Sequence, residues 1–240
     1  MPEAAGWDAS ADAWIETVEH DLNRVCVLDQ PMLEQCGTVA GRRVLDIGCG
    51  EGRFARMLAE RGAEVSGIDP TAAFIEVAKA KHPEGDYRVG VAEDLPYPDA
   101  SFDLLISYVA LVDIPDFRTA ISEMARVLRP GGRAVVSNLQ SFATARLDPW
   151  IEDAQGNRLY FSLDNYMEER ADDVAWKGIS ITNFHRPLSA YLESFLANGF
   201  ILKRFIEPLP SDEAIRKFPR LADYYRVPWM HLTTWEKPGG

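Results

Sequence analysis

Three alternating glycines follow a short apolar run and stand beside a carboxylate. Residues 44–47 have the pattern of a strand that contains Asp46, and Gly48, Gly50 and Gly52 come directly before a helical pattern. Glycine takes positive φ without strain and lets a ligand approach the bare backbone, and the first N–H groups of a helix are free to bind one. No Gly-Lys-Ser/Thr follows, so the loop is not predicted to bind a triphosphate.

A second predicted strand, 64–69, ends in Asp69. In a nucleoside site of this topology, a carboxylate at that strand end holds the ribose diol. The G-x-G-x-G spacing of the first loop differs from the G-x-G-x-x-G typical of dinucleotide sites. The two neighbouring strand ends therefore predict a site for a nucleoside.

Four motifs stand in a recognisable order: DIGCGEG at 46–52, Asp69, AEDLP at 92–96 with SFD at 101–103, and VLRPGG at 127–132. On these motifs the chain resembles the class I S-adenosylmethionine-dependent methyltransferases of the small-molecule type. The resemblance covers roughly residues 40–140. It implies an α/β fold with a doubly wound, Rossmann-like sheet of seven strands, in which strand seven is antiparallel, and S-adenosylmethionine as the cofactor.

The resemblance also implies roles for individual residues. Many relatives carry an Asp where Val91 stands, so the adenine contact passes to the backbone of Ala92 and the side chain of Glu93. N-terminal helices of related enzymes lie over the cofactor or substrate, and an arginine such as Arg24 can bind the methionine carboxylate with two hydrogen bonds. The predicted cofactor-binding residues are Asp46, Gly48, Cys49, Gly50, Gly52, Asp69, Pro70, Ala92, Glu93, Asp94, Ser107, Tyr108, Trp14 and Arg24.

The composition narrows the class of protein. The 240 residues carry a formal charge of −12 and no run of Lys or Arg, which disfavours a nucleic-acid partner. No apolar run is long enough to span a membrane, and the N-terminus has no signal-peptide pattern. We expect a cytoplasmic protein without a membrane partner, as a monomer or homodimer. The three cysteines form no C-x-x-C motif, and no metal site is expected.

The order of the predicted elements divides the chain into four parts. Residues 1–38 are an N-terminal helical segment, 39–138 a cofactor-binding core, 139–186 a cap inserted after strand five, and 187–240 the rest of the core sheet. The cap is too long for an ordinary connection, and its aromatic residues indicate an ordered segment. We expect the cap to form the acceptor pocket and the linker 208–228 to lie at the substrate edge.

The chemistry depends first on position. Methyl transfer requires alignment of the acceptor and exclusion of water, and a base is needed only if the acceptor loses a proton. His185 is the first candidate base, because it lies where the cap ends and the next helix opens, and because an imidazole titrates near neutrality; a structural contact at the helix start is the other reading. Tyr166 and Asp113 are weaker candidates. Arg186 with Arg158 or Arg146 could bind an acidic acceptor.

The sequence thus predicts methyl transfer to a small acceptor, aromatic or apolar, with O-methylation preferred over N- or C-methylation. Two alternatives remain. A nicotinamide-dependent oxidoreductase shares the strand, glycine turn and ribose acid, although the later motifs count against it. A non-catalytic nucleoside-binding module keeps the pocket without an acceptor site, and the aromatic cap counts against that.

Overall fold

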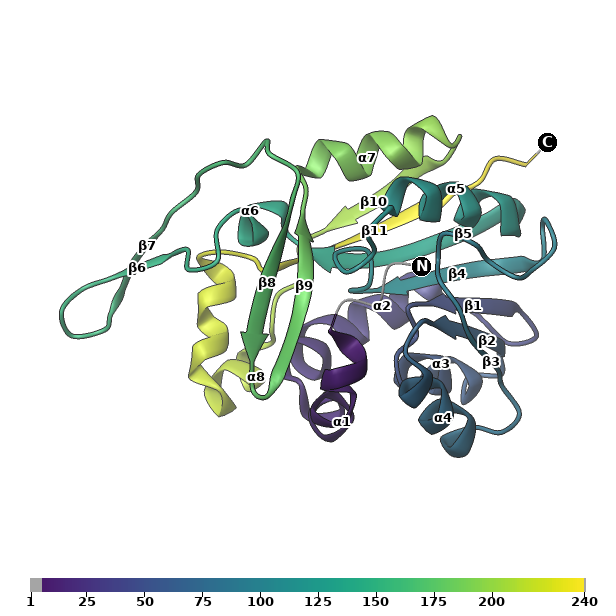
Figure 1. Cartoon of the computed structure of the whole chain (residues 1–240), viewed down its shortest axis with the longest axis horizontal. Helices are drawn as coiled ribbons and strands as arrows, with labels where there is room; N and C mark the ends of the chain where they lie inside the picture. Colours follow the sequence, from purple (N-terminus) through teal and green to yellow (C-terminus); the bar gives the residue numbers. More distant parts are fainter. Residues whose placement is uncertain (1–5, 240) are drawn as a thin grey trace.

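The computed structural model describes residues 6–239. Its central sheet has the order β10-β11-β5-β4-β1-β2-β3 (Figure 1). β11 pairs antiparallel with both β5 and β10, whereas β1 to β5 pair in parallel. The doubly wound sheet with an antiparallel seventh strand is confirmed. Its strands are β1 (Arg43–Ile47), β2 (Glu64–Asp69), β3 (Asp86–Val89), β4 (Phe102–Tyr108), β5 (Leu128–Leu139), β10 (Ile201–Ile206) and β11 (Met230–Glu236).

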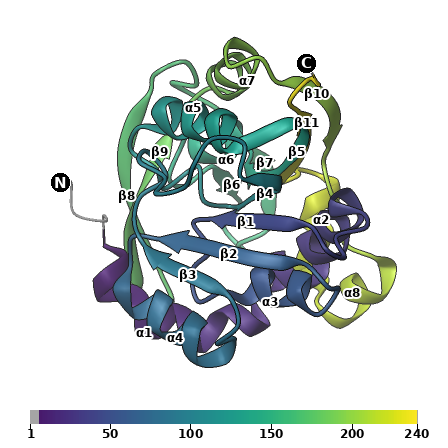
Figure 2. The same ribbon diagram turned by 90° about the vertical axis from the view of Figure 1, so that its right-hand side faces the viewer.

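Helices cover both faces of the sheet, and each face has its own apolar core (Figures 1 and 2). The central strand β4 is buried along its whole length, as expected for a parallel strand covered on both sides. α5 (Phe117–Val127) and α7 (Leu188–Ala197) pack on one face. The other face is covered by α2 (Asp29–Cys36), α3 (Arg53–Ala59), α4 (Ala72–Lys81) and α8 (Asp212–Lys217).

The N-terminal segment is helical but interrupted. It contains α1 (Trp7–Thr17), a 3₁₀ turn (Val18–His20) and a π-helical turn (Arg24–Leu28) before α2. Pro31 lies in α2 directly after the π-helical turn, and its missing N–H interrupts the regular α-helical hydrogen bonding there. α1 packs between α4 and the cap, in a cluster that includes Trp14, Phe74 and Ile181.

The cap consists of α6 (Ser141–Thr144) and two antiparallel hairpins. One joins β6 (Trp150–Glu152) to β7 (Arg158–Phe161), and the other joins β8 (Arg170–Trp176) to β9 (Ile179–His185). The β8–β9 hairpin crosses the carboxyl ends of the parallel strands, and the β6–β7 hairpin projects away from the body (Figure 1). No helix within residues 6–239 is long and apolar enough to cross a membrane.

Candidate functional site

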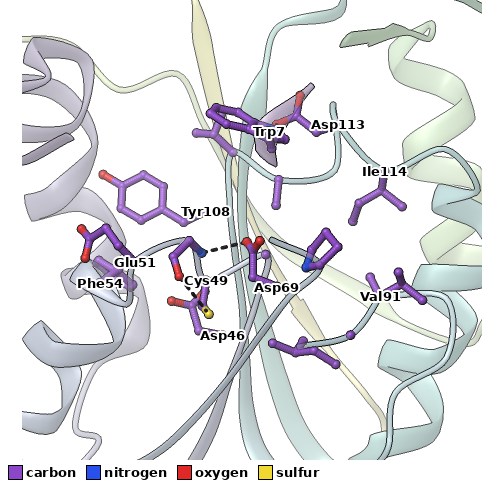
Figure 3. Close-up of a pocket in the computed structure, with 18 of the residues that line it drawn as sticks. Trp7, Asp46, Cys49, Glu51, Phe54, Asp69, Val91, Tyr108, Asp113 and Ile114 are labelled. Atoms are coloured by element: carbon purple, nitrogen blue, oxygen red, sulfur yellow. Dashed lines mark hydrogen bonds between the residues drawn. The ribbon is translucent and has the colours of Figure 1, made fainter. Parts of the chain in front are cut away.

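A pocket of about 360 Å³ lies at the carboxyl ends of β1 to β4 (Figure 3). The loops after these strands form its floor and sides, and the N-terminal segment covers it with Trp7, Trp14, Val18 and Arg24. Parallel α/β sheets bind ligands at this edge, and the volume is in the range that holds small molecules. The predicted nucleoside site therefore coincides with a real cavity.

The glycine loop shapes the pocket by close approach of the backbone. Gly48 has φ +72°, and a Cβ there would stand 2.4 Å from the Cβ of Ala110. The N–H of Gly50 donates to Asp69 at 2.9 Å, and the second oxygen of that carboxylate accepts from the N–H of Thr71 at 2.9 Å. Asp69 therefore ties the first loop to the end of β2.

Buried carboxylates give the pocket a negative charge. Asp46 Oδ1 and Glu51 Oε1 have no hydrogen-bond partner among the described residues. Burial, together with the charges of Asp69 and Glu51, raises the pKa of Asp46 to about 7. Burial also raises the pKa of Asp69 to about 6, against the two backbone hydrogen bonds that favour its ionised form. A cationic ligand would stabilise these carboxylates, so the chemistry of this wall fits a ligand with positive charge.

Among the described residues, Arg24 is one of the two cations that line the pocket, with Arg53. Its guanidinium carbon stands 4.5 Å from the ring centre of Trp14 and 5.3 Å from that of Tyr108, distances at which a cation is attracted to an aromatic face. Tyr108 is held in turn by Asp29, which accepts its hydroxyl at 2.7 Å and forms a two-bond ion pair with Arg53. Arg24 is thus oriented by neighbours whose own positions are fixed.

Asp113 lies across the pocket from Asp69 (Figure 3). One carboxylate oxygen accepts from the indole N–H of Trp7 at 3.3 Å, and the other accepts from the side-chain amide of Asn183. Burial raises the pKa of Asp113 to about 7 in spite of these donors. The pocket therefore contains a carboxylate that can take up a proton near neutral pH.

Val109, the first residue after β4, has φ +56°. This conformation is costly for a β-branched side chain, and such strain persists where the surroundings impose it, commonly at functional sites. Its N–H donates to Ser137 O at 2.9 Å. The strained turn carries the chain from the buried strand into the wall that holds Asp113.

Most of the predicted site residues meet in this pocket. Those that line it are Asp46, Gly48, Cys49, Gly50, Asp69, Pro70, Ala92, Glu93, Tyr108, Trp14, Arg24 and Asp113. Residues that the sequence did not single out also line it, among them Trp7, Val18, Phe54, Ile114, Pro115 and Asp116. For Trp7 and Val18 the sequence shows helical periodicity, but this pattern does not distinguish a residue that lines a pocket from one that packs in the core.

Three predicted cofactor contacts lie outside the pocket. Gly52 faces α4 and β3, since a Cβ there would meet Ala78 at 2.9 Å and Tyr87 at 3.2 Å. Ser107 is fully buried within β4, and Asp94 is exposed on the loop after β3. None of the three lines the cavity.

His185 and Tyr166 also lie outside the pocket, at the base of the cap. Both ring nitrogens of His185 are engaged, with Thr144 Oγ1 at 2.8 Å and with the carbonyl of Tyr166 at 2.9 Å. Burial lowers the pKa of His185. The hydroxyl of Tyr166 accepts from the N–H of Leu188 at 3.0 Å. These contacts join the cap to the start of α7, and they give His185 a structural place instead of the predicted catalytic one.

The cap itself contributes no residue to the pocket wall, contrary to the expectation that it would form the acceptor pocket. Arg186 is buried and donates to backbone carbonyls behind that wall. Arg158 pairs with Asp223 at 2.6 Å. Arg146 does not line the cavity either, so neither of the two arginine pairs predicted to bind an acidic acceptor reaches it, and nor do residues of the linker 208–228.

Comparisons with curated proteins place the core of the chain in a family. The family described as "Methyltransferase domain" matches residues 45–136. The chain is 36% identical over 148 residues to the ubiquinone biosynthesis O-methyltransferase of Alkalilimnicola ehrlichii, covering 57% of this chain and 59% of the relative. It is 35% identical to the malonyl-[acyl-carrier protein] O-methyltransferase of Serratia marcescens, covering 49% of this chain and 46% of the relative. The chain thus spans about half the length of these curated relatives.

Solved structures match over much more of the chain. A Listeria monocytogenes protein superposes with a TM-score of 0.77 at 28% identity, covering 95% of this chain and 98% of the other. The S-adenosylmethionine-dependent methyltransferase of Mesorhizobium loti has a TM-score of 0.76 at 31% identity, covering 86% of this chain and 94% of that one. With this likeness added to the acidic pocket at the strand ends, the chain belongs to the S-adenosylmethionine-dependent methyltransferases, and S-adenosylmethionine is its cofactor.

Proposed function

We propose that this methyltransferase methylates a hydroxyl oxygen of a small, uncharged molecule with an aromatic or apolar body. The observation that carries this proposal is Asp113, a carboxylate in the pocket wall next to the ring of Trp7. A hydroxyl acceptor loses a proton, and a carboxylate with a pKa near 7 can accept it. Curated relatives named as O-methyltransferases support the choice of oxygen over nitrogen or carbon.

The chain's residues fit the charges of the cofactor. The ammonium of its methionine part suits the unpartnered oxygens of Asp46 and Glu51, and its carboxylate suits the guanidinium of Arg24. Asp69 would accept from the ribose hydroxyls, and Ala92 with Glu93 would lie along the adenine. We therefore assign the polar part of the cofactor to the glycine loop and its base to the loop after β3.

When bound, S-adenosylmethionine supplies a methyl group on a positively charged sulfur, which keeps the electrons of the broken bond. The protein has two tasks around that group. Asp113 accepts the proton that the acceptor hydroxyl gives up, so charge balances as the new C–O bond forms. The tryptophans and Tyr108 limit the entry of water and hold the acceptor in line.

The charge of the wall restricts the acceptor. Carboxylates outnumber cations there. The cations are Arg24 and Arg53, and the carboxylates are Asp46, Glu51, Asp69, Glu93, Asp113 and Asp116. An anionic acceptor would be repelled by this excess. The apolar surface around Asp113 instead suits phenols and aromatic or terpenoid alcohols.

The first experiment measures cofactor binding by calorimetry and then S-adenosylhomocysteine formation with a panel of small phenols and alcohols. We expect binding of S-adenosylmethionine, no binding of NAD, and turnover of an uncharged hydroxyl compound. Asp113→Asn should lower turnover by about 10²–10⁴-fold at unchanged cofactor affinity. Asp86→Asn, on the exposed start of β3, is the matched control and should leave both unchanged.

The pH dependence gives a second readout of the same proposal. Turnover should fall as the pH drops through about 7, because the carboxylate of Asp113 becomes protonated there. Full turnover by Asp113→Asn with an alcohol acceptor would contradict the role of Asp113. Turnover only with carboxylic acids or amines would contradict the acceptor class.

A further inference from the structure

The end of β9 and Arg186, the residue after it, form hydrogen bonds to the loop after β4, which forms one wall of the pocket. The N–H of Phe184 donates to Val112 O at 2.7 Å. The guanidinium of Arg186 donates to Leu111 O at 3.0 Å, to Ile114 O at 2.6 Å and to Pro115 O at 2.9 Å, and the amide of Asn183 donates to the Asp113 carboxylate. Three residues of the cap, Asn183, Phe184 and Arg186, thus bind each of the five consecutive residues 111–115.

Arg186 is buried, with 3% of its surface exposed. Within the described part of the chain, no carboxylate lies within ion-pairing distance of it, and its charge is met by the three carbonyls and by the faces of Phe117 at 4.5 Å and Phe184 at 4.8 Å. Burying a cation is costly unless it is fully hydrogen-bonded. The loop must therefore keep its carbonyls turned toward Arg186.

Asn183 acts on the side chain of the same loop. Its amide binds one oxygen of Asp113, and the indole of Trp7 binds the other. The carboxylate is thereby held between the cap and α1, and each oxygen keeps a free lone pair. The charged groups that act on Asp113 across the pocket are Arg24, which favours its ionised form, and Asp69, which opposes it.

We propose that Asn183 and Arg186 are positioning residues, through which the cap fixes the orientation of Asp113 without lining the pocket. The inference rests on the proposed function, in which Asp113 accepts the acceptor's proton. It assigns to the cap a role in the reaction that differs from contact with the acceptor.

The first test needs no acceptor. The indole Nε1–H signal of Trp7 in a ¹H–¹⁵N spectrum, assigned with Trp7→Phe, reports the protonation of the carboxylate to which it donates. We expect this signal to titrate near pH 7, and in Asn183→Leu its midpoint should rise by about one pH unit, since a hydrogen bond to the ionised form is lost. Thr182→Val, which removes only the bond to Asp173 on the same hairpin, should leave the midpoint unchanged. An unchanged midpoint in Asn183→Leu would overturn the role of Asn183.

The second test addresses Arg186. Arg186→Lys keeps the charge but cannot reach three carbonyls, and we expect the Kd of S-adenosylhomocysteine to rise about tenfold as the wall loosens. Arg170→Lys is the control. Arg170, like Arg186, donates to backbone carbonyls, but these belong to Thr144 and Ala145 in the cap and not to the loop 111–115. Equal weakening by both variants would mean general loosening of the cap and would overturn the proposal.

The two proposals fail in different ways. If Asp113→Asn keeps full turnover while Asn183→Leu still moves the Trp7 midpoint, the proton-accepting role of Asp113 is wrong and the positioning role of Asn183 stands. If Asp113→Asn loses turnover while neither Asn183→Leu nor Arg186→Lys changes its readout, the positioning role is wrong and the proposed function stands.

Discussion

Replacing Asp46 by Asn should stabilise the protein without its cofactor and weaken cofactor binding. Asp46 is 1% exposed, one of its oxygens is unpartnered, and its pKa is raised to about 7 by burial and by neighbouring carboxylates. Its negative charge is therefore costly in the empty pocket. A bound cation removes that cost, so the same charge that destabilises the free protein favours the complex.

The magnitude follows from the pKa difference. A carboxyl with a pKa of about 7 in place of 3.8 costs about 4 kcal/mol at pH 8, at ~1.4 kcal/mol per unit. An Asn amide would itself be buried without full hydrogen bonding, which costs ~1–2 kcal/mol. We expect a net gain of about 2 kcal/mol in the free energy of unfolding at pH 8.

The sign also fixes the pH dependence. Because the folded pKa is raised, the stability associated with Asp46 is fully present below its ordinary pKa and is lost as the pH rises through about 7. The advantage of the Asn variant should thus be largest at pH 8 and should vanish near pH 5, and the variant should be the less stable protein toward pH 4, where only the cost of burying the amide remains. Cofactor affinity should fall by about 10–100-fold at pH 8, the effect of losing one charge-assisted hydrogen bond.

Denaturant unfolding at pH 8 and pH 5 measures the stability, and calorimetry measures the affinity. Asp103→Asn is the matched control, since Asp103 is a buried carboxylate that accepts from Arg43 N at 2.8 Å and pairs with Arg129 at 2.9 Å, away from the pocket. That variant should lose stability and keep cofactor affinity. A destabilised Asp46→Asn with unchanged affinity would refute the reasoning.

Two further substitutions test the site. His185→Ala should lower the free energy of unfolding by ~1–3 kcal/mol, because Thr144 and Tyr166 lose a buried partner, while calorimetry should show unchanged cofactor affinity; lost turnover at full stability would instead restore His185 as a base. Arg24→Met keeps a similar volume over Tyr108 and should weaken S-adenosylmethionine binding about tenfold with little effect on thermal unfolding. Unaltered affinity in Arg24→Met would place the cofactor carboxylate elsewhere.

The core of the fold and the polar end of the site were predictable because their signals are local. Asp46 and Asp69 each stand at the end of an apolar run, and the parallel order of β1 and β2 brings such strand ends together. The glycine at 48 marks a backbone position with positive φ and a close neighbour. Each of these features is encoded within a few residues.

The remaining walls depend on contacts between distant residues. Trp7 and Asn183 meet Asp113 across 106 and 70 positions, and no spacing in the sequence shows such a meeting. The position of His185 between the cap and the next helix favours a catalytic role, but β9 pairs with β8 and thereby holds His185 at the base of the cap, against Tyr166. The hairpins of the cap also escaped prediction, because β8 alternates between partly buried and exposed residues with no apolar face.

The hydrogen bonds from residues 183–186 to the loop 111–115 restrict where the cap can be joined when it is exchanged between related enzymes. A graft that replaces all of 139–186 would remove the donors to 111–115, so the pocket wall would lose its support at the same time as the cap is exchanged. A chimera with its second junction at residue 182 would retain those donors and still exchange both hairpin turns. The cap therefore has two parts: residues 139–182, which are open to redesign, and residues 183–186, whose contacts tie them to the pocket wall.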